Sequence, residues 1–287
     1  MRNESVRDHS GVGSLRIPHS AFRIPHSALR TRPIMTRPYI LSESTFRTVS
    51  STKYEIAILP WGATEAHNYH LPYGTDNVQC DRLAAEAARR AWEQGAKVIV
   101  LPTVPFGVNT GQLDIPLTIN MNPSTQLAVL RDVVDALAGQ GLRKLVVLNG
   151  HGGNDFRQMI RELSTRTPVF ISAIEWWKVI DPKGFFEKSG DHAGELETSV
   201  MMHVAPELVR PLSEAGSGGA KRPRPAGMRE GWAWAPRAWT RVTADTGIGD
   251  PSLASAEKGA RYTDAVVGRV ADFLVELARV DPKDLYE

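Results

Sequence analysis

Residues 54–60, Tyr-Glu-Ile-Ala-Ile-Leu-Pro, form a mostly apolar run that predicts a buried β-strand. Similar runs follow it at 97–103, 144–148 and 168–174. Helical patterns lie between and after these runs, at 76–94, 123–140, 155–164, 195–204 and 255–280. Strands that alternate with helices through short connections are typical of a parallel sheet with helices on both faces. The sequence therefore predicts an α/β fold with a mostly parallel central sheet.

The composition is that of a globular enzyme-sized chain. Of 287 residues, 42% are hydrophobic and 23% are charged, which excludes collagen-like, coiled-coil and wholly disordered proteins. The only cysteine, Cys80, excludes an intrachain disulfide framework and a cysteine-rich zinc module. A reducing compartment, the cytoplasm, is expected on this basis. No run approaches the roughly 18 apolar residues of a membrane span.

The positive charge is concentrated at the N-terminus. Residues 1–38 hold seven Arg against two acidic residues, whereas the rest holds 27 Lys and Arg against 30 Asp and Glu. The heptapeptide at 16–22 is repeated almost exactly at 23–29. We expect residues 1–38 to be a disordered basic tail and residues 39–287 to be a single domain with no nucleic-acid face. Deleting residues 1–34 should lower the isoelectric point without changing folding or activity, which melting curves would check.

The segment after the first strand carries the strongest chemical signal. Glu65, His67, His70 and Asp76 fall within twelve residues, after the predicted strand and up to the predicted helix. A Glu and a His two residues apart project to the same side of an extended segment, and a carboxylate at the helix start can bridge two cations. Oxygen and imidazole ligands suit zinc, manganese or iron. The alternative is that Asp76 only caps the helix and the histidines are turn residues.

A second polar cluster, Asn149-Gly-His-Gly-Gly-Asn154, follows the third strand. Its glycines allow backbone to approach a ligand closely, and His151 is expected in the same crevice as Glu65. A phosphate-binding turn is the alternative, but the segment has no Lys and no Walker-type spacing.

The third cluster runs from Gly190 to Ser199. If it is helical throughout, His192, Glu195 and Ser199 share one face, and Glu197 lies away from it. A helix start capped by Asp191 and a proton shuttle beside a metal-bound water both fit this pattern.

These three clusters together resemble the creatininase family of metal-dependent amidohydrolases. The resemblance runs from about residue 44 to 277 and includes a late segment, 249–259. It implies a three-layer α/β/α fold with one or two divalent ions. It also implies that Glu65, Asp76 and His151 hold one metal, that His67 and Asp76 hold the other, and that His192 is catalytic. Family members hydrolyse non-peptide C–N bonds and form homo-oligomers, hexamers included.

The sequence departs from the family pattern in several places. Asn68-Tyr69 replaces the commoner Gly-Pro, and segment 105–112 lacks a histidine that many relatives carry. Gly153 stands where creatinine-hydrolysing enzymes have a second-metal glutamate. Creatinine is therefore not the expected substrate. The second site then recruits Glu195, or is weak, or is empty.

The expected function is metal-assisted hydrolysis of a small cyclic or linear amide. His192, positioned by Glu195 or Glu197, passes a proton to the leaving nitrogen. Substrate binding is assigned to Asn109, Trp176 and Trp177, although paired tryptophans are more often core. The alternatives are a hydrolase of a formamide or a cyclic sugar-like ketone, and a non-catalytic metal- or nucleotide-binding module.

Overall fold

Four parallel strands form the central sheet of the computed structural model, which describes residues 37–188 and 190–286. The strands are β1 (Ile56–Trp61), β2 (Val98–Val100), β3 (Lys144–Asn149) and β4 (Phe170–Glu175), and their order is β2-β1-β3-β4. All three pairings are parallel. Every residue of β1, β2 and β3 is buried, as expected for a parallel sheet that has helices on both faces. The four predicted strands are confirmed.

The five predicted helices are also present. They are α2 (Thr75–Glu93), α3 (Pro123–Gly139), α4 (Phe156–Ser164), α5 (Glu195–Val204) and α8 (Ala256–Arg279). Shorter elements complete the list: α1 (Phe46–Ser50), α6 (Ala226–Glu230), α7 (Trp239–Val242), β5 (Gly190–His192) and β6 (Ile248–Gly249), the last two paired antiparallel. The helices begin and end within one or two residues of the predicted positions.

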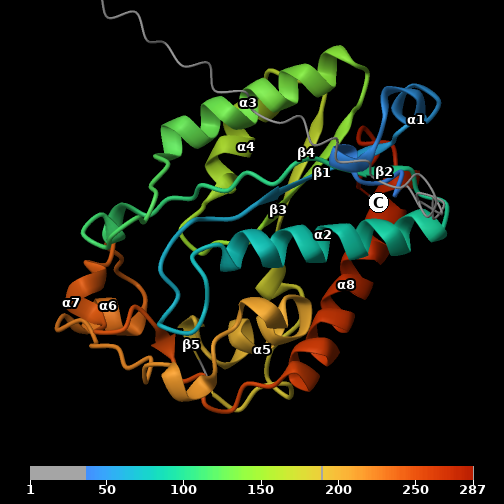
Figure 1. The fold of residues 1–287 in the computed structure, drawn as a ribbon. Coiled ribbons are helices and arrows are strands. Elements are labelled where there is room, and N and C mark those ends of the chain that lie inside the picture. Colours follow the sequence, from blue (N-terminus) through green and yellow to red (C-terminus); the bar gives the residue numbers. More distant parts are fainter. Residues whose placement is uncertain (1–36, 189, 287) are drawn as a thin grey trace, which may run out of the picture. The chain divides into compact units, whose positions relative to one another are not determined.

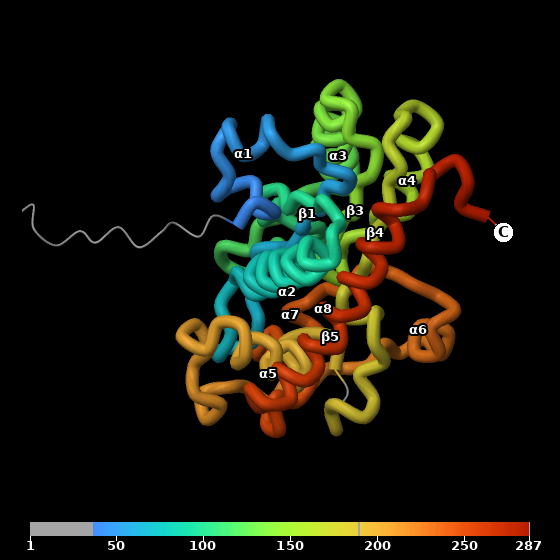
Figure 2. Tube along the Cα trace, turned by 90° about the vertical axis from the view of Figure 1, so that its right-hand side faces the viewer, coloured from blue at the N-terminus to red at the C-terminus, as the bar shows by residue number. Residues whose placement is uncertain are grey.

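Two hydrophobic cores cover the two faces of the sheet (Figures 1 and 2). On one face, Ile58 and Val146 pack with Leu83 of α2 and Val266 of α8. On the other face, the alternate strand residues pack against α3 and α4, through side chains such as Leu130, Val134, Phe156 and Met159. The alternation of side chains along each strand sends neighbouring residues to opposite cores. The three-layer α/β/α architecture is confirmed.

The strand order creates a crevice between β1 and β3. The chain leaves β1 into α2, on one face, and leaves β3 into α4, on the other face. Ligands bind at such a switch point, at the carboxyl ends of the strands. Trp61 and Asn149, the last residues of β1 and β3, are paired there. The loops that carry Glu65 and His151 therefore start side by side.

Residues 216–242 form an ordered excursion that contains α6 and α7. Gly111 packs against this excursion so closely that a Cβ atom at 111 would lie 2.0 Å from the carbonyl oxygen of Arg237. The side chain of Thr240 also donates a hydrogen bond to Asp114. The excursion is thus fixed to the segment around residues 110–114.

Arg37 pairs with Glu43, and the carbonyl of Pro38 accepts a hydrogen bond from Tyr54, so the last two residues of the predicted tail contact the domain. The predicted tail otherwise lies outside the described residues. Among the helices that the structure describes, none is both long enough and apolar enough to cross a membrane.

Candidate metal centre

Six side chains from three loops meet at the carboxyl ends of β1 and β3. Glu65 and His67 lie in the loop after β1, and Asp76 lies in the first turn of α2. His151 follows β3, His192 ends β5, and Glu197 lies in the first turn of α5. All are buried except Glu197, which is half-buried.

The first ligand group consists of Glu65, Asp76 and His151. His151 Nδ1 lies 2.7 Å from Glu65 Oε1 and 3.2 Å from Asp76 Oδ2. Both carboxylate oxygens are buried, and the described residues offer neither of them a well-aligned hydrogen-bond donor. Buried polar atoms without a partner are rare in folded proteins. A divalent cation would satisfy all three atoms.

The second ligand group consists of His67, Asp76 and Glu197. His67 Nε2 lies 3.0 Å from Asp76 Oδ1. The ligand atoms within each group lie within 4.8 Å of one another. Asp76 therefore directs Oδ2 to the first group and Oδ1 to the second. This division is what a carboxylate that bridges two ions requires.

The orientation of each imidazole is fixed by a backbone carbonyl. A carbonyl can only accept, so the ring nitrogen that faces it must donate. His67 Nδ1 donates to Glu65 O at 3.1 Å, His151 Nε2 to Val108 O at 3.1 Å, and His192 Nε2 to Ala66 O at 2.8 Å. The other nitrogen of each ring then faces the carboxylates. Metal-bound histidines are oriented in this way by their second nitrogen. The residues present fit divalent ions.

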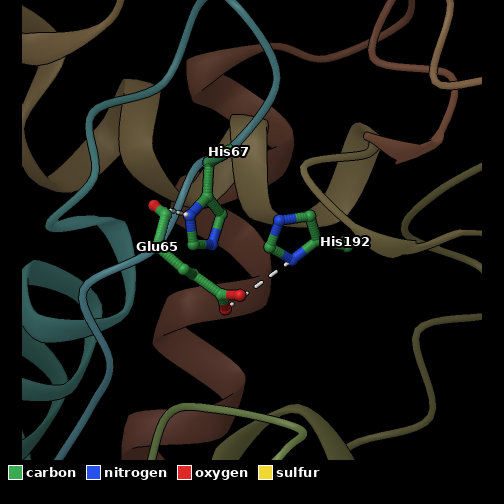
Figure 3. A group of neighbouring side chains, drawn as sticks. All are labelled: Glu65, His67 and His192. Atoms are coloured by element: carbon green, nitrogen blue, oxygen red, sulfur yellow. Dashed lines mark hydrogen bonds and ion pairs between the residues drawn. The ribbon is translucent and has the colours of Figure 1, made fainter. Parts of the chain in front are cut away.

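His192 lies close to both groups without being central to either. Its ring is 4.1 Å from that of His67 between centroids, and its Nδ1 is 3.9 Å from Glu65 Oε1 (Figure 3). Ala193, which follows it, has a left-handed backbone with φ of 51°. This conformation is unfavourable for a residue with a Cβ atom, and strained backbone clusters at functional sites. The bend turns β5 into α5 and leaves His192 directed at the site.

The surroundings favour charged forms of these groups. Burial alone would lower the pKa of His67, but Asp76 outweighs burial and raises this pKa to about 10. Burial would likewise lower the pKa of His151, but Glu65 and Asp76 hold it well above its ordinary value. Burial would raise the pKa of Glu65, yet His151 and His192 hold it below its ordinary value. Without metal, protons on the imidazoles balance the carboxylates.

Metal binding should therefore release protons, because an imidazole must be neutral to bind an ion. The raised pKa of His67 stabilises the metal-free fold fully below pH about 6.5, the ordinary value, and this contribution is lost as the pH rises through about 10. We expect the melting temperature of chelator-treated protein to fall between pH 7 and 10, and that of manganese-loaded protein to fall less. An equal fall in the melting temperatures of the two forms would contradict the raised pKa of His67 in the metal-free protein.

A cavity of about 440 Å³ opens at the site, and all of the six residues except His67 line it. Asn109 and Trp177, two of the predicted substrate-binding residues, line it. Trp176 does not: it is 1% exposed and belongs to the core beneath α8. Both tryptophans lie in the 3-10 turn Trp176–Lys178 that follows β4, and consecutive side chains of such a turn point in different directions, so only Trp177 faces the cavity.

Several lining residues were missed by the sequence argument. Trp239 packs edge-on against His192 at 5.2 Å, and Arg237 pairs with Asp191, the neighbour of His192. Gln112 donates a hydrogen bond to Glu65 Oε2. None of these residues belongs to the three polar clusters, and their approach depends on how the 216–242 excursion folds.

Known proteins resemble this chain in sequence and in fold. The family model described as Creatininase: Creatinine amidohydrolase matches residues 41–274. The chain belongs to the creatininase family. It is 30% identical to the mycofactocin precursor peptide peptidase of Mycolicibacterium smegmatis over 254 residues, which cover 82% of this chain and 90% of that protein. The relatives are hydrolases.

Solved structures of the family show the same fold. A Bacteroides fragilis protein, provisionally assigned as a creatinine amidohydrolase, is 48% identical with a TM-score of 0.83, and the match covers 88% of this chain and all of that one. Creatininase structures include a manganese form, with a TM-score of 0.71 over 84% of this chain and 99% of that one, and a Zn–Zn form. At 22% identity, these show likeness of fold alone.

This creatininase-family chain cannot carry a side chain at Gly153. A Cβ atom there would lie 2.3 Å from Val108 O and 2.4 Å from His151 Nε2. The packing that orients His151 therefore leaves no room for the glutamate that creatinine-hydrolysing enzymes have at this position. Glu197, from α5, belongs to the second ligand group.

The predicted alignment of His192 with Glu195 on one helix face was wrong. His192 lies in β5, and α5 begins only at Glu195, after the bend at Ala193 and Gly194. Asp191 is not the helix cap that one alternative required, because the N-terminal boundary residue is Gly194. Counting both residues on one continuous helix produced the error.

Glu195 is placed away from the metal groups. Its Oε2 accepts hydrogen bonds from the backbone N–H groups of Glu187 and Lys188, at 2.9 and 2.7 Å. Its Oε1 lies 2.6 Å from Lys258 Nζ. Both oxygens already have donors, so the structure does not support Glu195 as the residue that completes the second site.

Glu195→Gln should keep the full metal content and lower the melting temperature. The amide removes the charge that Lys258 faces and can accept at only one of the two former oxygens. Elemental analysis of the purified variant, with a thermal melt, checks both parts. Loss of one ion from this variant would restore Glu195 as a ligand.

Proposed function

We propose that this chain is a two-metal hydrolase that cleaves the C–N bond of a small amide. The observation that carries the proposal is the division of Asp76, whose two oxygens face two separate ligand groups beneath one cavity. Two ions held this way polarise a carbonyl and lower the pKa of a bound water. Zinc, manganese and iron all suit the mixed oxygen and imidazole donors.

The chain's own residues would supply the proton transfer. His192 Nε2 is committed to Ala66 O, so Nδ1 is the nitrogen that faces Glu65 and the cavity. This nitrogen can take a proton from the attacking water and give it to the leaving nitrogen. Trp239 packs against the ring and limits its rotation. Glu197 accepts a hydrogen bond from Ala193 N, so it also holds the bend that directs His192.

The cavity bears on the size of the substrate. Its volume of about 440 Å³ is within the ordinary range for pockets that enclose a small molecule. Trp177 and Asn109 are proposed to contact the substrate, Trp177 through its ring and Asn109 through its amide. The mycobacterial relative is named a peptide peptidase, so a peptide bond is the second candidate for cleavage.

The predicted homo-oligomer, for example a hexamer, and the predicted cytoplasmic location remain part of the proposal.

The proposal is tested on protein that has been stripped with a chelator and reloaded with Mn²⁺ or Zn²⁺. The substrate panel contains cyclic and linear amides, formamides, cyclic sugar-like ketones and short peptides. We expect hydrolysis of a non-peptide amide that depends on added metal. Cleavage of peptides alone would make the chain a peptidase, and turnover of the ketones alone would exclude C–N chemistry. Metal binding with no turnover of any class would favour a non-catalytic module.

A further inference from the structure

Gln112 is a buried glutamine whose amide group meets a metal ligand. It is 3% exposed and lies at the end of a short 3-10 turn, Thr110–Gln112. Its Nε2 donates a hydrogen bond to Glu65 Oε2. The other oxygen of the same carboxylate, Oε1, faces His151 Nδ1 at 2.7 Å. The two oxygens of Glu65 therefore have different partners, one amide and one ligand group.

The orientation of the Gln112 amide is forced by chemistry. An ionised carboxylate only accepts hydrogen bonds, so the –NH₂ end of the glutamine must face Glu65. A carboxylate must be ionised to bind a metal ion. Glutamine Oε1 has no donor among the residues that the structure describes. Among the described residues, Glu65 is thus the partner of the Gln112 amide nitrogen, and the amide oxygen has none.

The backbone holds Gln112 in this position from both sides. Its N–H donates to Asn109 O, and its carbonyl accepts from Ile115 N, each at 3.0 Å. Gly111 next to it packs on Arg237 O, and no side chain could fit between them. The 216–242 excursion therefore presses the 3-10 turn towards the site. A fixed donor at Glu65 Oε2 holds the carboxylate with Oε1 directed at the ligand group.

We propose that Gln112 is a positioning residue that sets the affinity of the Glu65, Asp76 and His151 group for its metal ion. The inference rests on the proposed two-metal function. Gln112 contacts Glu65 and neither His67 nor Glu197, so it acts on one ion and not on the other. Partners that orient metal ligands typically contribute 10- to 100-fold to metal affinity. We expect a loss of this size at the first group alone.

The test is Gln112→Leu, which keeps approximate size and removes the donor. Gln126→Leu is the matched control. Gln126 is equally buried, its Nε2 also donates to a side-chain oxygen, at 2.8 Å on Asn154, and its Oε1 likewise has no partner in the described chain. Its partner is not in a ligand group. Leucine at 126 therefore reproduces the burial change without touching a ligand.

Mn²⁺ binding to wild type and both variants is measured by calorimetry, and retained metal is counted after dialysis against a chelator. We expect Gln112→Leu to weaken one of two binding steps about 10- to 100-fold and to retain one ion where wild type retains two. Gln126→Leu should lower stability and keep both affinities. Glu65→Gln identifies the affected step, because it should abolish the same one.

Three results would overturn the inference alone. The first two are unchanged affinities in Gln112→Leu and equal weakening of both binding steps, since a general structural defect has that effect. Equal losses in Gln112→Leu and Gln126→Leu would also overturn it. A wild-type protein that binds no ion would overturn the proposed function and the positioning role together. The first three results leave metal binding by the wild type intact, so failure of the positioning role can be distinguished from failure of the proposed function.

Discussion

Asp76→Ala should remove both metal ions and lower hydrolysis by about a thousandfold. Asp76 is the only residue that belongs to both the first and the second ligand group. Its Oδ2 lies 3.2 Å from His151 Nδ1, and its Oδ1 lies 3.0 Å from His67 Nε2. Losing it leaves each group with two protein ligands, fewer than the usual three at catalytic zinc. Metal catalysis contributes several kcal/mol to transition-state stabilisation, and each 1.36 kcal/mol is tenfold in rate.

Elemental analysis and the rate on whichever substrate the wild type cleaves check this prediction. Asp81→Ala is the control, because Asp81 lies on the same helix, is exposed, and contacts Thr103 outside the site. The single-group variants Glu65→Gln and Glu197→Gln should each lose one ion. Two ions retained in Asp76→Ala would show that the carboxylate does not bridge.

His192→Asn should keep both ions and lower turnover by about 10²- to 10⁴-fold, the usual contribution of general acid–base catalysis. His192 Nδ1 is 3.9 Å from Glu65 Oε1, whereas the ligand nitrogens of His67 and His151 lie 3.0 and 2.7 Å from their carboxylates. This longer separation places His192 beside the ions and close to the reacting groups.

His203→Asn serves as the control for the loss of a histidine. His203 lies on the exposed side of α5, away from both ligand groups. It should leave rate and metal content unchanged. His192 also forms a compact group with Glu65 and His67. A His192→Asn protein that lost an ion would therefore be a ligand variant, and the proton-transfer role would fall to another group.

The fold was predictable because each element has its own local signal. The run at 54–60 is apolar throughout and short, as a strand buried on both faces must be. Pro123 marks the start of α3, as predicted, although the Asn122 side chain before it makes no capping hydrogen bond. In the site, Glu65, His67, Asp76 and His151 were predictable because the parallel topology brings the ends of β1 and β3 together.

The rest of the site depends on conformation that no residue spacing reveals. Spacing alone placed Glu195 beside His192 and Glu197 away, because it assumed one helix through both. The left-handed bend at Ala193 breaks that assumption and exchanges the two glutamates: Glu197 reaches the second group, and Glu195 binds Lys258. Gln112 and Trp239 were missed for a related reason, since tertiary packing of the 216–242 excursion brings both segments to the site.

The most direct test of the two-ion centre is an anomalous difference map from a crystal of the manganese-loaded protein. The geometry predicts two peaks that share Asp76, one beside Glu65 and His151 and the other beside His67 and Glu197. A single peak, or a second peak beside Glu195, would contradict the account.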